Sequence, residues 1–183
     1  MESPVRPEVG KESYLSKTNG INGKLREIPE DFIVNEIIEK KHRAHWAWAQ
    51  SSDNGRHCIV KVTANNWDTH ILVKEISKRL NIGQKAIGFA GTKDKRALTT
   101  QHLSVMSSPK KISEINLENV YIKFLHKSVK PVRLGNLVGN EFKIKISQSN
   151  NDEETITNIL EELKNGFPNY FGIQRFGAVR PIT

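Results

Sequence analysis

The sequence predicts an α+β domain built on a largely antiparallel, mixed sheet flanked by helices. Segments in which apolar residues alternate, as in strands, outnumber the segments with a helical period, of which there are two. The chain has 183 residues, with 28 lysines and arginines against 20 aspartates and glutamates, giving a net charge of +8. This length is enough to bury a core. A basic excess makes nucleic acid the first partner to consider, with an ordinary basic protein as the alternative.

The strands are expected in the middle of the chain. Residues 1–22, rich in proline, glycine and serine, are predicted to form an extended or weakly ordered lead-in, and 23–183 to form the domain. The Pro29-Glu-Asp turn precedes the first strand. Alternation and β-branched residues predict strands at 32–37, around Trp46 and Trp48, and at 57–63, 99–105, 120–125 and 141–147.

Two amphipathic helices are expected. The first begins at Asn66 as N-cap and runs to about Leu80, where Asn81 and Gly83 end it. The second follows an acidic first turn at Asp152 and runs to residue 165, before the helix-ending Gly166 and Pro168. We expect buried apolar faces at Leu72, Ile76 and Leu80 in the first helix and at Ile156, Ile159/Leu160 and Leu163 in the second.

Several protein classes are excluded by composition. The single cysteine, Cys58, rules out an intramolecular disulfide and a multi-cysteine zinc site. No apolar run reaches the roughly 20 residues needed to span a bilayer, and the first residues lack the apolar region of a secretory signal. A reducing cytoplasm is the predicted location, without a membrane.

The segment 87–101 carries the main chemical signal. Asp94 lies between Lys93 and Lys95-Arg96, shortly after two glycines. Three cations favour the ionised carboxylate and attract a polyanion. If the segment is extended, Lys93 and Lys95 point one way, towards phosphate, and Asp94 points the other way, towards a nucleoside.

The glycines Gly88 and Gly91 suggest two other readings. A Walker A loop is rejected because the lysine spacing is wrong and a strand, not a helix, follows. A KH domain places a GXXG loop between two helices, and KH-like RNA binding remains the non-enzymatic alternative.

Two later clusters can be interpreted either as structural or as functional. In residues 133–142, Asn140 and Phe142 share a strand face if the strand begins there, and they would suit hydrogen bonding and stacking of a base; taken alone, the segment favours turn and core roles. Residues 169–177 combine three aromatics, two glycines and Arg175, which suits either a ligand loop or packing. The basic stretch Lys127, Lys130 and Arg133 would track phosphates or form a solvated face.

Taken together, these clusters resemble the tRNA pseudouridine synthase D family, in its archaeal/eukaryotic-like branch. The resemblance covers about residues 22–183, the amino-terminal portion of the family. It is carried, in the family's order, by Lys24 with Pro29-Glu-Asp-Phe-Ile-Val-x-Glu36, by Phe89-Ala-Gly-Thr-Lys-Asp-Lys-Arg-Ala97 with Thr99-Thr-Gln, by His126-Lys with Arg133-Leu-Gly and Gly139-Asn-Glu-Phe, and by Pro168-Asn-Tyr-Phe-Gly-Ile-Gln-Arg-Phe-Gly177.

The resemblance implies a pseudouridine-synthase-like catalytic core that isomerises uridine to pseudouridine in RNA, with the D-arm of tRNA as the expected target and no cofactor or metal. It implies that Asp94 is catalytic, that Phe142 stacks on the flipped base, and that Asn140 orients Asp94 or the base. Glu36 with Lys24 would form a supporting polar pair. Further RNA contacts are expected from Lys93, Lys95, Arg96, Phe171 and Arg175.

The chain is shorter than the members of that family. We therefore expect an incomplete catalytic sheet with an exposed edge, which favours self-association, and a chain that does not turn over alone. A non-catalytic RNA-binding module, KH-like or a degenerate synthase fragment, is the alternative function.

Overall fold

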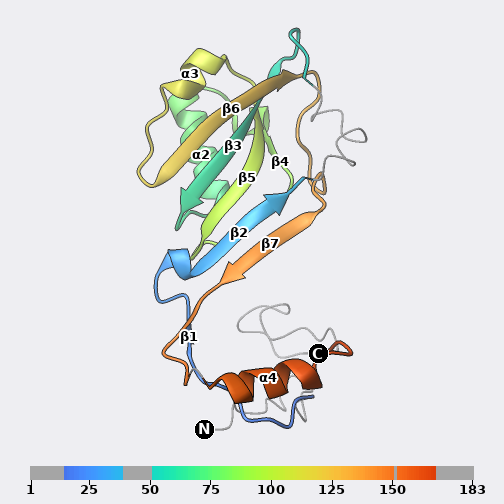
Figure 1. The fold of residues 1–183 in the computed structure, drawn as a ribbon. Coiled ribbons are helices and arrows are strands. Elements are labelled where there is room, and N and C mark those ends of the chain that lie inside the picture. Colours follow the sequence, from blue (N-terminus) through green and yellow to red (C-terminus); the bar gives the residue numbers. More distant parts are fainter. Residues whose placement is uncertain (1–14, 39–50, 151, 168–183) are drawn as a thin grey trace, which may run out of the picture. The chain divides into compact units, whose positions relative to one another are not determined.

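The computed structural model describes residues 15–38, 51–150 and 152–167 (Figure 1). The chain forms two units, one of Met1–Lys24 with Ser147–Thr183 and one of Leu25–Ile146. The predicted boundary at residue 22 stays a prediction. The predicted class, an α+β fold with a mixed and largely antiparallel sheet, is confirmed. Within the described ranges no helix is long and apolar enough to cross a membrane.

The larger unit is built on a six-stranded sheet (Figure 1). The strand order is β6-β3-β5-β2-β7, with β4 also paired to β5. Only the β2–β5 pair is parallel among the described pairs of this sheet, and the others are antiparallel. The strands are β2 (Phe32–Ile37), β3 (His57–Asn65), β4 (Ile87–Phe89), β5 (Leu98–Val105), β6 (Val120–Ser128) and β7 (Gly139–Ile144). A separate pair is formed by β1 (Lys24–Leu25) and β8 (Ile146–Ser147).

One edge of β5 has two partner strands in succession, and we call the interval between them the fork. Strand β3 pairs with the whole length of β5 along one edge. On the other edge, β2 pairs with Leu98–Thr100 and β4 pairs with Leu103–Val105. Gln101 and His102 therefore lie where one partner strand ends and the other begins.

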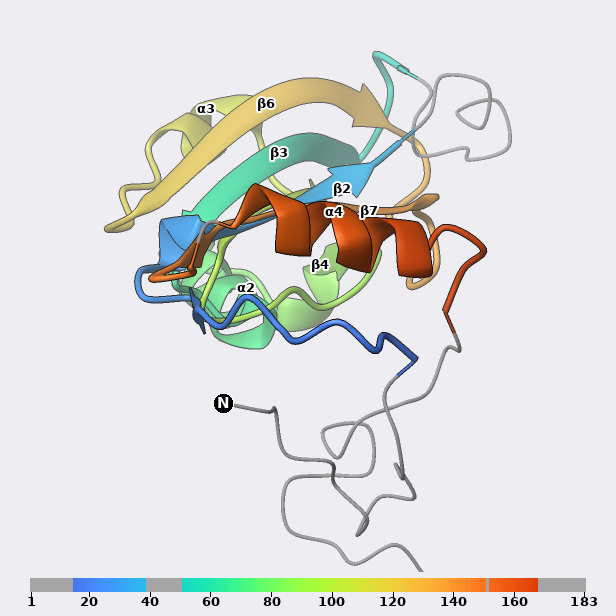
Figure 2. The ribbon, with the colours of Figure 1, turned by 60° about the horizontal axis from the view of Figure 1, so that its bottom comes forward.

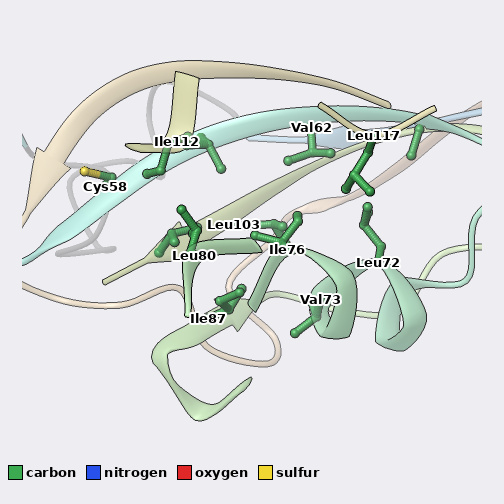
Figure 3. Close-up of a cluster of buried hydrophobic side chains, with 13 residues drawn as sticks. Cys58, Val62, Leu72, Val73, Ile76, Leu80, Ile87, Leu103, Ile112 and Leu117 are labelled. Atoms are coloured by element: carbon green, nitrogen blue, oxygen red, sulfur yellow. The ribbon is translucent and has the colours of Figure 1, made fainter. Parts of the chain in front are cut away.

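Helix α2 (Thr69–Leu80) covers one face of the sheet, whose strands curve above it in Figure 2. Its buried stripe of Leu72, Val73, Ile76 and Leu80 packs against β3 and β5 (Figure 3). The short helix α3 (Pro109–Ser113) lies beside the edge strand β6 and adds Ile112 to the same core. The predicted apolar face of the first helix is confirmed.

The start of α2 differs from its prediction. Asp68, not Asn66, is the N-cap, because its carboxylate accepts the backbone N–H groups of His70 and Ile71 at 2.8 and 3.1 Å. Asn66 instead adopts a left-handed φ of 60° and donates its N–H to the Ala97 carbonyl at 3.0 Å. The helix ends where expected, with Asn81 in the left-handed conformation.

The second helix, α4 (Glu153–Glu162), has the expected N-cap, Asp152, but a different burial. None of its residues is buried, and Leu160 is 64% exposed, so the prediction of a buried face is wrong within the described residues. An amphipathic helix buries its stripe only where another element covers it. The contacts that α4 does make are polar, since Glu162 accepts the N–H of Lys17 at 2.8 Å and of Thr18 at 3.3 Å.

The predicted strands are largely confirmed, with extended ends at β3 and β6. The predicted strand at 141–147 is split, since β7 ends at Ile144 and β8 begins at Ile146. The predicted strand around Trp46 and Trp48 lies outside the described residues.

Truncation of the α2 core should be costly. Ile76 is 1% exposed, and we expect Ile76→Ala to lower the free energy of unfolding by about 3 kcal/mol, because it leaves a cavity between α2 and the sheet. The matched control is Ile71→Ala in the same helix, where Ile71 is 49% exposed and the change should stay within about 0.5 kcal/mol. Urea denaturation followed by circular dichroism measures both, and equal losses would contradict this assignment of the core.

Candidate functional site

Asp94 lies on the loop that joins β4 to β5, next to the first turn of α2. The loop is held to the helix by a hydrogen bond in which the Lys93 N–H donates to Thr69 Oγ1 at 2.9 Å. At its far end, the Ala97 carbonyl accepts the Asn66 N–H at 3.0 Å. The segment is thus a fixed loop rather than the extended strand that would alternate Lys93, Asp94 and Lys95.

The partner of Asp94 is Arg26. Arg26 Nη2 donates to Asp94 Oδ1 at 3.0 Å, with both side chains about one third exposed. The guanidinium also lies over the Phe32 ring, 3.7 Å from its centroid, and Arg96 donates to the Arg26 carbonyl at 3.3 Å. A partly exposed carboxylate, paired with a guanidinium group, is therefore present at the surface of the sheet.

The backbone at Arg26 is strained. Its φ of 57° is in the left-handed region, which costs a residue other than glycine or asparagine about 1 kcal/mol or more. The contacts to Asp94 and Phe32 offset this cost.

An exposed aromatic ring lies beside this pair. Phe142 of β7 makes an edge-to-face contact with Phe32, with ring centroids 5.9 Å apart, and remains 52% exposed. In the antiparallel register, Phe142 is opposite Val34 and Asn140 is opposite Glu36. Asn140 and Phe142 thus share one strand face, as the sequence predicted, and it is the face that carries Phe32. A flat ring of this kind can stack on a base.

Glu36 and Lys93 form a buried ion pair behind Asp94. Glu36 Oε2 lies 2.9 Å from Lys93 Nζ, and these side chains are 0% and 2% exposed. Glu36 Oε1 accepts the His102 backbone N–H at 3.1 Å and lies 3.2 Å from His102 Nδ1. Glu36 thereby fills the fork beside β5 and satisfies a backbone donor there.

Burial by itself would raise the pKa of Glu36. The His102 hydrogen bond and the Lys93 ammonium outweigh this effect, and the pKa of Glu36 lies below its ordinary value of 4.5. At neutral pH, Glu36 is accordingly an ionised carboxylate although it is buried. The opposed charges of Glu36 and Lys93 form a compact pair inside the domain.

One expectation for the cations is corrected by this geometry. Lys93 was expected to point towards solvent phosphate with Lys95, but its side chain is buried because the loop turns it towards Glu36. Within its own unit, Glu36 has Lys93 and His102 as partners, and its expected pairing with Lys24 stays a prediction. Lys95 and Arg96 are exposed, as an RNA contact requires.

The remaining predicted features are either located by the structure or lie outside the described residues. Gly88 lies in β4 and Gly91 in the loop before β5, so these two glycines belong neither to a Walker A loop nor to the helix-flanked loop of a KH domain. Phe171 and Arg175 lie outside the described residues. In the part of the chain that the structure covers, no three His, Cys, Asp or Glu side chains gather at metal-ligand spacing.

Arg26, His102 and Thr69 were not found from the sequence. Arg26 and Lys24 both precede Pro29, and the local pattern does not distinguish them. The left-handed residue that turns the chain becomes visible only in the backbone. His102 and Thr69 are ordinary strand and helix residues whose contacts come from other elements.

The acid sensitivity of the fold should depend on Glu36. A carboxylate whose pKa is lowered on folding stabilises the protein above its unfolded pKa, and this stabilisation is lost as the pH falls through the folded pKa. Glu36→Gln leaves the Lys93 charge unpaired, so at about pH 7 we expect it to lower the free energy of unfolding by about 3 kcal/mol or more. The difference from the wild type should shrink as the pH falls below 4.5 and through the lowered pKa of Glu36 in the folded state, where the wild-type pair also breaks. Urea denaturation at several pH values measures it, and a difference that is independent of pH would contradict this account.

Comparison with known proteins bears directly on this site. Residues 8–183 match the family model described as "tRNA pseudouridine synthase D (TruD)". A probable tRNA pseudouridine synthase D from Methanosarcina barkeri is 41% identical over 186 residues, covering 98% of this chain and 40% of that relative. A relative of the same description from Pyrococcus abyssi is 43% identical over 173 residues, covering 93% of this chain and 40% of its own length.

A solved structure agrees with these matches. The crystal structure of the putative tRNA pseudouridine synthase D from Methanosarcina mazei superposes with a TM-score of 0.85 at 40% identity, covering 99% of this chain and 41% of that one. This chain spans about two fifths of the length of the relatives it matches. With the family model matching nearly all its residues, the chain belongs to the tRNA pseudouridine synthase D family.

Proposed function

We propose that the protein containing this chain isomerises uridine to pseudouridine in RNA, with Asp94 as the catalytic residue and without a cofactor. One observation supports this proposal best. The Asp94 carboxylate, paired with Arg26 at 3.0 Å, lies on the sheet face that presents the exposed ring of Phe142. Membership of the tRNA pseudouridine synthase D family favours tRNA as the substrate. The D-arm of tRNA stays the expected target.

The reaction needs a carboxylate that stays charged. Isomerisation breaks the C1′–N1 bond and forms a C1′–C5 bond, after which the C5 proton leaves to solvent and N1 gains a proton. Ionised Asp94 has two routes to this outcome, attack on C1′ or removal of the 2′-proton. In both routes the Arg26 guanidinium holds the carboxylate in place and supplies its counter-charge.

The base must leave its stack to reach Asp94. Extrusion of a nucleotide costs a few kcal/mol, which contacts in the pocket offset. Phe142 would stack on the base, and Asn140 on the same strand face would offer amide groups for its polar edge. The exposed Lys95 and Arg96 would contact the neighbouring phosphates.

The other expectations follow from this function as proposals. A tRNA-modifying enzyme would act in the cytoplasm. The strand β7 is an outer strand of the described sheet, with exposed Phe142 and Ile144, and self-association through this edge stays a prediction.

Asp94→Asn should abolish pseudouridine formation. The variant keeps the shape of the side chain but removes the charge that both chemical routes require, and RNA affinity should stay similar or become tighter. Unmodified tRNA transcripts are incubated with the chain, or with the whole protein in which it occurs, and pseudouridine is mapped by carbodiimide treatment and primer extension. Stops that persist with Asp94→Asn would contradict the assignment. RNA binding with no stops from the whole wild-type protein would favour a non-catalytic RNA-binding module.

Phe142→Ala should slow the reaction without unfolding the sheet. Stacking of a base on an aromatic ring contributes about 2 kcal/mol, so kcat/KM should fall about 30-fold. Ile144→Ala is the matched control, since Ile144 lies two residues further along β7 and is 46% exposed. Equal kinetic losses in both variants would contradict a stacking role.

A further inference from the structure

A buried cluster of three ionisable side chains lies behind the Asp94 loop, and the proposed chemistry does not use these side chains. Its members are Lys93, Glu36 and His102, whose side chains are 2%, 0% and 13% exposed. A lysine whose side chain is 2% exposed and whose ammonium nitrogen lies 2.9 Å from a carboxylate cannot at the same time contact an RNA phosphate. Lys93 therefore needs a different explanation from its exposed neighbours Lys95 and Arg96.

Lys93 is held at both of its ends. Its backbone N–H donates to Thr69 Oγ1 in the first turn of α2, and its ammonium group reaches Glu36 in β2. Glu36 is itself held at the fork by the backbone N–H of His102 in β5. The residue directly before Asp94 is thus tied to a helix and to two strands.

We propose that Lys93 is a positioning residue for Asp94, with Glu36 as its anchor, and that Lys93 makes no phosphate contact. This inference rests on the proposed function. With the Lys93 backbone fixed, the chain direction into Asp94 is fixed as well, and the carboxylate meets Arg26 rather than free solvent. A misplacement of about 1 Å at a reacting group costs about 100-fold in rate.

Burial of Lys93 also gives the two cations near Asp94 separate partners. Arg26 pairs with Asp94 while Lys93 pairs with Glu36, so each carboxylate has its own partner. A released Lys93 ammonium would compete with Arg26 for Asp94. Loss of the Glu36 charge should therefore act on the rate of the chemical step rather than on RNA affinity.

The first test compares rates and binding in the whole protein in which this chain occurs. Glu36→Gln and Lys93→Met should each lower kcat about 100-fold, while KM and the affinity for tRNA change little. The salt dependence of tRNA binding should stay unchanged in Lys93→Met. Lys95→Met is the matched control one position from Asp94 on its other side, and it should reduce the slope of log affinity against log salt by about one.

The double variant Glu36→Gln/Lys93→Met separates positioning from stability. No unpaired charge remains buried in it, so its thermal midpoint should recover towards the wild-type value relative to Glu36→Gln alone. Its kcat should stay low, because the anchor is still absent. Recovery of kcat together with the midpoint, or a reduced salt slope in Lys93→Met, would overturn the proposal.

A readout that does not depend on catalysis keeps the inference separate from the proposed function. Brief acetylation with an amine-reactive ester, followed by peptide mass spectrometry, should modify Lys95 rapidly and Lys93 much more slowly. Bound tRNA should protect Lys95 and leave the slow rate at Lys93 unchanged, and Glu36→Gln should accelerate modification of Lys93. Equal labelling of both lysines in the wild type would refute the buried anchor even if the protein forms no pseudouridine, whereas slow labelling of Lys93 in an inactive protein would count against the proposed function alone.

Discussion

The ion pair between Lys93 and Glu36 is the interaction on which the geometry of the site depends. Removing two charges from water costs several kcal/mol for each ion, and their attraction offsets this cost only when further hydrogen bonds satisfy both groups. Here the backbone N–H of His102 and the His102 ring supply those bonds to Glu36. An apolar pair of the same volume would fill the space equally well but could not tie the loop to the fork in one orientation.

The fork explains why a carboxylate is needed at position 36. A strand that loses its neighbour leaves backbone donors without partners, and a buried donor without a partner is costly. β2 leaves β5 after Thr100, and β4 joins it at Leu103. Glu36 reaches into this interval and accepts the N–H of His102, so one side chain both completes the sheet and holds the loop.

Adjacent residues of the loop serve opposite purposes because the chain turns between them. Lys93 is buried and paired with Glu36, whereas Asp94 is about one third exposed and paired with Arg26 at the surface that carries Phe142. The Pro29-Glu-Asp turn before β2 likewise contains a residue with a structural role, Asp31. It is buried and accepts the Ile28 N–H at 3.2 Å, so part of that motif shapes the turn rather than the chemistry.

Local pattern was sufficient for the strands, for the apolar stripe of α2 with Leu72 and Ile76, and for the shared face of Asn140 and Phe142. These features depend on residue spacing along one element, which the sequence displays directly. The sequence by itself therefore determined the fold class and the family, and it marked Asp94 as the candidate catalytic carboxylate. Tertiary structure alone decided that Lys93 is buried, that Glu36 pairs with it, and that Arg26 is the cation that meets Asp94. The reason is that burial and ion pairing arise between elements distant in sequence, where a fork in the sheet and a left-handed turn set directions that no local periodicity encodes.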